Sequence, residues 1–506
     1  MKKRYTLKPG ELTLADIYHL LTHKIDIVLE ENAWKSIEGS EKFVREIIGA
    51  NITVYGINTG FGLLANTKID SDELELLQRR ILLSHATGVG EILSNDITKL
   101  ILLLKINSLA RGYSGVRREI IETLIQFYNH EIYPCIPCKG SVGASGDLAP
   151  LAHLALPLIG EGRVSYRGNI ITGKEALACI DLVPIQLAPK EGLALLNGTQ
   201  VSCGIALYHL FQAHALLNAS IVIGAMTVDA AQGSNIPFQP LIHEVRGHVG
   251  QIIIAQRLSQ LLAKSEIMSA HQECNRVQDP YSLRCQPQVL GACLDSFKHV
   301  AQILTIEANA VSDNPLIFSE EKLVMSGGNF HAEPIAQVAD FLAIALSEIG
   351  AIAERRIALL VDPHFNKGLP AFLTPNPGLN SGFMIAHVTS AALASANKSL
   401  AHPHSVDSIP TSANQEDLVS MSTNAAWRLK EMLENVRYIL AIELLAACQG
   451  IDLRRPLRLS PDLEKVMVMV RNKVDFFKED RLIAPDIEKA HDLTIEIANT
   501  QKSLLW

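Results

Sequence analysis

The sequence predicts a mainly α-helical fold, with a long central helical bundle and a loop-rich N-terminal domain. Of the 506 residues, 48% are hydrophobic and 19% are charged, which is typical of helices buried on most sides. After residue 200, apolar residues recur at helical spacing over long stretches, whereas the preceding chain mixes short helical patterns with glycine-bearing turns. We therefore expect an N-terminal domain over residues 1–200 and, over residues 201–506, a bundle core with C-terminal helices.

Composition and charge exclude several classes of protein. The net charge is -8, and the only basic run is the short start of the chain, so we expect no nucleic-acid partner. That start leads into no apolar core, and the eight cysteines are scattered, so we expect a cytoplasmic protein. Residues 205–226 are strongly apolar but include His209 and Asn218, which would be costly in lipid. A buried helix rather than a membrane span is predicted there.

Within the first 200 residues, two segments carry the strongest local signals. A glycine-rich turn is expected over residues 51–62. A helix is expected after Asp147, which is a favoured N-cap residue, with Pro150 in the first turn. Apolar side chains then recur at helical spacing, at Leu148, Leu151, Leu154 and Leu158. Cys135 and Cys138 form a lone CxxC pair with no partner pair, so we interpret them as structural.

The second half of the chain predicts long helices. Residues 332–360 form one extended helical run, with Pro334 near its start and Pro363 just past its end. Three further runs of the same kind lie at residues 386–400, 425–448 and 485–504. A short helix is also expected near residue 280, with Asp279 as its cap and Pro280 in its first position.

The tripeptide Ala144, Ser145 and Gly146 lies between glycines at the start of the helix that follows Asp147. Glycines allow the backbone to fold tightly enough for an amide nitrogen to approach a carbonyl carbon. The positive end of the helix dipole would stabilise negative charge that develops there. A phosphate-binding loop is the alternative, but no Lys-Ser or Lys-Thr follows the glycines.

This tripeptide resembles the one from which the histidine and aromatic amino acid ammonia-lyases form their electrophile. In that family the glycine nitrogen attacks the alanine carbonyl, and loss of two waters leaves a methylidene-imidazolone (MIO). The resemblance implies that Ala144, Ser145 and Gly146 form an MIO autocatalytically, with no external cofactor and no metal. It also implies the fold of the fumarase/histidase-like superfamily.

Further blocks resemble the same family, in the same order along the chain. Tyr55, at the edge of the glycine-rich turn, is implied to be the catalytic base. A phenol with a pKa of about 10 needs nearby positive charge for that role. Asn197 lies in a block at residues 191–200 and is implied to lie beside the MIO, where its amide could donate. Phe330, in a glycine turn at residues 326–331, is implied to be an active-site aromatic. Taken alone, each block would be read as an ordinary turn.

The block at residues 278–288 is implied to bind substrate. Tyr281 and Arg284 are three residues apart and share a helix face. The planar guanidinium of Arg284 suits a carboxylate, because it can bind both oxygens at once. By resemblance, Tyr281 lies near the MIO and Gln278 faces the substrate side chain.

The choice of amino acid depends on two further positions. Ser84 and His85 resemble the Ser-His pair of the histidine members at a place where tyrosine-preferring members have His-Leu and phenylalanine-preferring members have Phe-Leu. Glu416 stands where phenylalanine members resemble a glutamine. A phenyl ring would leave both polar groups unpaired, at about 1–3 kcal/mol each. Leu418 departs from the histidine members, many of which have a histidine there.

The resemblance therefore implies an enzyme that converts L-histidine to trans-urocanate and ammonia, the first step of histidine degradation. It also implies a homotetramer whose active sites are shared between chains. The alternatives are a tyrosine or phenylalanine lyase, an aminomutase, and a helical scaffold without activity. A fumarase or aspartase is disfavoured, because their Gly-Ser-Ser loop is absent.

Overall fold

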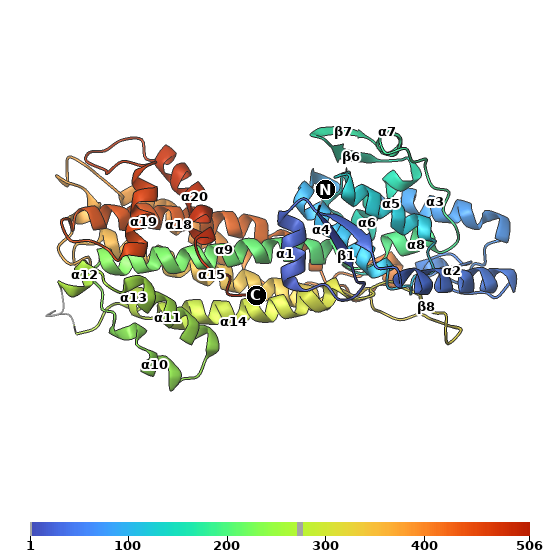
Figure 1. The fold of residues 1–506 in the computed structure, drawn as a ribbon, viewed down its shortest axis with the longest axis horizontal. Coiled ribbons are helices and arrows are strands. Elements are labelled where there is room, and N and C mark those ends of the chain that lie inside the picture. The colour runs from blue at the N-terminus through green and yellow to red at the C-terminus, as the bar shows by residue number, and fades with distance from the viewer. Residues whose placement is uncertain (1–2, 271–276, 506) are drawn as a thin grey trace. The chain divides into compact units, whose positions relative to one another are not determined.

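The computed structural model describes residues 3–270 and 277–505, and most of them are helical. The chain divides into two compact units, which are described separately here (Figure 1). Unit 1 contains Met1–Tyr208, Ala301–Asp340 and Pro403–Trp427, and unit 2 contains His209–Val300, Phe341–His402 and Arg428–Trp506. Mainly α architecture is thus confirmed, and the strands that are described are short.

Unit 1 combines short helices with small sheets. Its helices are α1 (Leu14–Thr22), α2 (Ala33–Gly49), α3 (Leu74–His85), α4 (Asn95–Leu109), α5 (Arg118–Asn129), α6 (Leu148–Ala155), α7 (Gly173–Ala178), α8 (Glu191–Leu196) and α17 (Ser422–Trp427). Its 3-10 turns are η1 (Gly62–Leu64), η2 (Ser71–Glu73), η3 (Leu156–Ile159) and η6 (Ser412–Asn414). Its strands are β1 (Arg4–Leu7), β2 (Asp26–Leu29), β3 (Val89–Ile92), β4 (Tyr133–Pro134), β5 (Pro137–Lys139), β6 (Arg163–Tyr166), β7 (Asn169–Thr172), β8 (Leu316–Phe318) and β9 (Leu323–Met325).

The strands pair locally. β1 pairs with β2 in parallel, and β3 with β5 and β8 with β9 are antiparallel pairs. The described chain also has a three-stranded antiparallel sheet in the order β4-β6-β7. The site depends instead on helices, because α3, α6 and α8 pack against one another.

Three long helices have residues in both units: α9 (Gln200–Ala230), α14 (Gln286–Ala308) and α15 (Glu333–Val361). By length and composition alone, each of the three could cross a membrane. The most apolar window of α9 is 89% buried inside the protein, as predicted for the apolar run at residues 205–226. The corresponding shares are 67% for α15 and 44% for α14.

The other elements of unit 2 are mostly helices. They are η4 (Ile236–Phe238), α10 (Pro240–Glu244), α11 (Val249–Leu262), α12 (Glu266–Ser269), α13 (Tyr281–Arg284), η5 (Ala371–Leu373), α16 (Met384–Leu400), α18 (Leu429–Asp452), α19 (Pro461–Arg471) and α20 (Ala484–Asn499). Within this unit α18 packs against α16 and α20.

The predicted helices agree with the structure, with three differences. Helices α15 and α16 confirm the runs at residues 332–360 and 386–400 to within two residues. The run at residues 425–448 is two helices, α17 and α18, with a turn at Arg428. The last run ends early, at Asn499, because the Thr500 hydroxyl donates to the carbonyl of Ile497 at 2.7 Å and closes the final turn. The helix after Asp147 becomes a 3-10 turn before Leu158.

Candidate active site

A cavity of about 690 Å³ in unit 1 brings together predicted site residues that are far apart in the sequence. Its lining includes Tyr55, His85, Ser145, Asn197 and Glu416. These side chains come from the turn at residues 51–62, the end of α3, the start of α6, the end of α8 and the loop after η6. The cavity therefore collects groups that can bind a small polar molecule.

The turn that carries Ser145 requires glycine on its C-terminal side. Gly146 has φ = 70°, and a Cβ atom there would lie 2.1 Å from the carbonyl oxygen of Gly198. Gly146 and Gly198 also form an isolated parallel β-bridge, and the N–H of Asp147 donates to the Gly198 carbonyl at 2.7 Å. The tripeptide is thus held directly against the turn that follows Asn197.

Asp147 stands at the N-cap position of α6, but its carboxylate does not cap the helix. Oδ1 accepts from the hydroxyls of Ser141 at 2.9 Å and Thr423 at 2.6 Å. Oδ2 accepts from the N–H of Ser202 at 2.8 Å and from its hydroxyl at 2.9 Å. Asp147 is thus the N-cap residue, as predicted, but its carboxylate joins three other segments instead of bonding to the helix N-terminus. Burial raises the pKa of Asp147, and these four hydrogen bonds oppose the shift.

The two carboxylate oxygens of Glu416 accept hydrogen bonds from different residues. Oε1 accepts a hydrogen bond from the hydroxyl of Ser145 at 2.9 Å. Oε2 accepts from the hydroxyls of Thr411 at 2.6 Å and Ser412 at 2.8 Å. The backbone of Thr411 pairs with that of Glu416, and residues 412–414 all have positive φ values between 49° and 66°. Strained backbone of this kind is found at functional sites, where the surrounding contacts hold it in place.

His85 is the last residue of α3, and its ring lines the cavity. Burial lowers the pKa of His85, while a backbone interaction at Ile81 and the negative charge of Glu416 oppose that shift. The hydroxyl of Ser84 lies 3.0 Å from His85 Nδ1.

Sequence reasoning missed Arg80, which also lines the cavity. Its spacing of four residues from Ser84 could have indicated a shared helix face.

Asn197 follows α8, and both of its polar groups are buried. Its Nδ2 donates to the carbonyl of Asn314 at 3.2 Å. Its Oδ1 has no hydrogen-bond partner among the described atoms, although it is buried. A buried acceptor without a partner is costly, so the arrangement favours a donor placed in the cavity. Asn314 Oδ1 accepts from the N–H of Gly327, which connects this site to the turn that carries Phe330.

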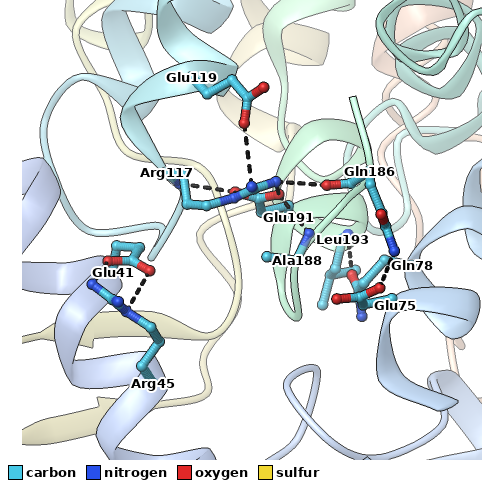
Figure 2. A network of polar contacts seen from close by, with 10 residues as sticks. All are labelled: Glu41, Arg45, Glu75, Gln78, Arg117, Glu119, Gln186, Ala188, Glu191 and Leu193. Atoms are coloured by element: carbon cyan, nitrogen blue, oxygen red, sulfur yellow. Dashed lines mark hydrogen bonds and ion pairs between the residues drawn. The ribbon is translucent and has the colours of Figure 1, made fainter. Parts of the chain in front are cut away.

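An ion pair between the buried Glu191 and the half-buried Arg117 anchors α8, the helix that Asn197 follows, as Figure 2 shows. The Glu191 carboxylate accepts from Arg117 Nε at 2.9 Å and from Arg117 Nη2 at 2.8 Å. It also accepts the backbone N–H groups of Arg117 at 2.9 Å and Ala188 at 2.7 Å. Gln78 of α3 accepts from the N–H of Leu193 at 3.2 Å. Side chains from two other segments therefore fix the position of α8.

Tyr55 lies at a turn that Asn58 holds together. Asn58 accepts the N–H of Val54 at 2.8 Å and donates to the carbonyl of Ile52 at 2.9 Å. Gly56 has φ = 73°, and a Cβ atom there would lie 2.6 Å from the side chain of Leu193. The turn thus packs closely against α8 and directs Tyr55 into the cavity lining.

The cavity does not include every residue that the sequence singled out. Phe330 belongs to unit 1 but does not line the cavity. Gln278, Tyr281 and Arg284 belong to unit 2, where Gln278 and Tyr281 are exposed in the single chain. The guanidinium of Arg284 lies 4.6 Å from the ring centre of Tyr281, so the two side chains share a face as expected.

The start of the helix around Tyr281 differs from the prediction. Pro280 is the N-cap of α13 rather than its first residue. Asp279 does not cap this helix, because its carboxylate accepts the N–H of Ser234 at 2.6 Å. Its carbonyl accepts from Arg284 Nε at 2.9 Å, which holds the guanidinium near the start of the helix.

Comparison with known proteins identifies related chains over nearly the full length. The family described as aromatic amino acid lyase matches residues 12–472. A histidine ammonia-lyase of Pseudoalteromonas atlantica is 59% identical over 490 residues, which cover 97% of this chain and 96% of that one. One of Legionella pneumophila (strain Corby) is 58% identical over 489 residues, 97% of each chain. The crystal structure of histidine ammonia-lyase from Trypanosoma cruzi is similar with a TM-score of 0.89 at 41% identity, covering 99% of this chain and 95% of that one.

Proposed function

The chain belongs to the aromatic amino acid lyase family, and from that premise we propose that it converts L-histidine to trans-urocanate and ammonia. The observation that carries the choice of substrate is the pairing of His85 with Glu416 in one cavity. An imidazole can form hydrogen bonds with both groups, whereas a phenyl ring offers neither of them a hydrogen-bond partner.

The family and its structural relatives depend on an MIO, and the residues of this chain fit such a group. Ala144, Ser145 and Gly146 are adjacent, and the positive φ of Gly146 suits a tightly closed backbone. Ser145 and Asn197 both line the cavity. When formed, the MIO supplies an electrophile that makes the substrate amine a better leaving group.

The remaining steps belong to side chains of this chain. Tyr55 accepts a proton from the β-carbon, the bond between the α-carbon and nitrogen breaks, and a double bond forms between the two carbons. Ammonia leaves with the electron pair of the broken bond. Arg284 binds the substrate carboxylate through two hydrogen bonds. His85, Gln278 and Glu416 bind the imidazole.

Asn197 and the positive end of α6 stabilise negative charge near Ser145. Tyr281 and Phe330 complete the surroundings of the electrophile. We propose a homotetramer in which the active sites are shared between chains, as the membership of this family implies. The proposal includes no nucleic-acid partner and a cytoplasmic location.

A comparison of three substrates tests the proposed function. The purified protein is mixed separately with L-histidine, L-tyrosine and L-phenylalanine, and the ultraviolet absorbance of the conjugated product is followed. Product from histidine alone is expected. A cinnamate-type product would contradict the roles of His85 and Glu416, and a β-amino acid product would indicate an aminomutase.

A single substitution tests the MIO. Ser145→Ala removes the hydroxyl that is lost during maturation, so we expect a folded protein with almost no turnover. Its intact mass should equal that of the encoded chain, whereas the unsubstituted protein should be lighter by two waters. Turnover near that of the unsubstituted protein would contradict MIO formation at this position.

A further inference from the structure

Lys105 is a buried lysine in the second half of α4, and its side chain bonds to the backbone of Asn197, a residue that lines the cavity. The residue is 1% exposed. Its Nζ donates to the backbone carbonyl of Asn197 at 2.7 Å. Ammonium groups are almost never fully buried without a partner, so this placement calls for an explanation.

Opposing effects act on the pKa of Lys105. Burial, together with the charge of Lys190, lowers its pKa to about 7. The carboxylates of Asp313 and Asp147 oppose this shift. Lys190 Nζ already pairs with Asp313 Oδ2 at 2.7 Å, and both of these side chains are buried. The second lysine is therefore not needed to pair Asp313, and its direct contact is the Asn197 carbonyl.

That carbonyl belongs to the peptide that joins Asn197 to Gly198. A Cβ atom on Gly146 would lie 2.8 Å from the nitrogen of Gly198 and 2.1 Å from its carbonyl oxygen. The same carbonyl oxygen of Gly198 accepts the N–H of Asp147. A hydrogen bond that fixes the plane of the Asn197 peptide therefore has two effects. It orients the Asn197 side chain toward the cavity, and it positions the Gly198 backbone against which Gly146 packs.

We propose that Lys105 is a positioning residue, which holds the turn at Asn197 and Gly198 against the Ala144–Gly146 tripeptide both for MIO formation and for turnover. This role rests on the proposed function. The buried hydrogen bond from Nζ to the Asn197 carbonyl, at 2.7 Å, suits this role because it joins α4 directly to the turn. Lys105 does not contact substrate in this arrangement, and it acts through Asn197.

The test compares Lys105→Met, Lys105→Arg and Lys99→Met in the full chain. Lys99 is a matched control, because it is also on α4 and donates to two backbone carbonyls, those of Leu21 and His23. Intact mass gives the fraction of chains that have lost two waters, and steady-state kinetics with L-histidine give kcat and KM.

For Lys105→Met we expect a larger fraction of chains at the encoded mass and a kcat lowered on the order of 10- to 100-fold. KM should change by less than about threefold, because substrate contacts are intact. Lys105→Arg should restore much of the mass loss, and Lys99→Met should match the unsubstituted protein.

Two results would overturn the proposal. One is a Lys105→Met protein that matures fully and has an unchanged kcat. The other is an equal effect of Lys99→Met, which would indicate general destabilisation of α4. If Lys105→Met does not fold, Lys105→Gln replaces it and must show the same excess of encoded mass. An unsubstituted protein with neither mass loss nor turnover would defeat the proposed function itself, and with it the role of Lys105.

Discussion

Thr411 helps to determine which carboxylate oxygen of Glu416 is turned toward the cavity. With Ser412, its hydroxyl occupies Oε2 of Glu416, so that Oε1 is the oxygen turned toward Ser145 and the cavity. In the proposed MIO the Ser145 hydroxyl has been lost as water, which would leave Oε1 free to accept the imidazole N–H of the proposed substrate. The specificity of the site thus depends on a residue that need not contact the substrate.

The variant Thr411→Val keeps the shape of the side chain and removes its hydroxyl. We expect KM for L-histidine to rise on the order of 10-fold, since the lost hydrogen bond involves a charged acceptor. The change in kcat should be smaller. Thr389→Val is the control, because Thr389 is exposed and its hydroxyl bonds only locally, to the carbonyl of Ile385. Unchanged KM in Thr411→Val would show that Ser412 and the loop backbone suffice to orient Glu416.

Single residues were predictable from sequence only where a local motif marks them. The glycine-rich blocks indicated Tyr55, Ser145 and Asn197, which the structure places in one cavity. Lys105 and Thr411 are marked by no such motif. Lys105 bonds to Asn197, which is 92 residues away, and Thr411 bonds to Glu416, which is 5 residues away, and both contacts exist only in the folded chain. Asp147 is at the predicted N-cap position, but N-cap propensity cannot foresee that its carboxylate bonds to the hydroxyls of Ser202 and Thr423.

At the scale of elements, the end of α9 contains a carboxylate that should make stability depend on pH. Asp229 lies in the last turn of this helix, where the helix dipole disfavours negative charge. Its Oδ1 accepts from the hydroxyl of Ser265, the N-cap of α12, and its Oδ2 has no partner among the described atoms. Burial raises the pKa of Asp229 to about 7, and the charge of Glu464 contributes to the shift.

The sign of the dependence follows from the raised pKa. Between pH 4 and 7, roughly, the folded protein keeps a proton at Asp229 that the unfolded chain loses. The stabilisation is complete below that window and is lost as the pH rises through it, with a slope of up to about 1.4 kcal/mol per pH unit. Asp229→Asn should therefore reduce the fall in Tm between pH 5 and pH 8. Asp492→Asn, at an exposed carboxylate of α20, is the control and should leave that fall unchanged.

Helices were easier to predict than their ends. Long apolar periodicity located α15 and α16, because burial of one helix face governs such segments. The ends depend on single hydrogen bonds, such as that of Thr500 to Ile497, and periodicity carries no information about them. Small elements such as η6 were not predicted at all, since their positive φ values are imposed by contacts with Glu416.

At the scale of the whole molecule, the residues with proposed roles are divided between the two units of the chain. Ser145 and Glu416 belong to unit 1, whereas Arg284 belongs to unit 2. The exposure of Tyr281, 71% in the single chain, is unusual for a residue assigned beside an electrophile. A homotetramer with shared sites accounts for it, because a second chain would cover that surface.

Complementation between two inactive variants tests this assembly. Ser145→Ala lacks the electrophile, and Arg284→Met lacks the carboxylate clamp, so each alone should be almost inactive. If Ser145 and Arg284 of one site come from different chains, co-expression in equal amounts leaves about a quarter of the sites with both native residues. The rate of urocanate formation should then reach about a quarter of the rate of the unsubstituted protein. Activity that stays at the level of the single variants, in tetramers shown by light scattering to be mixed, would place both residues of each site on one chain.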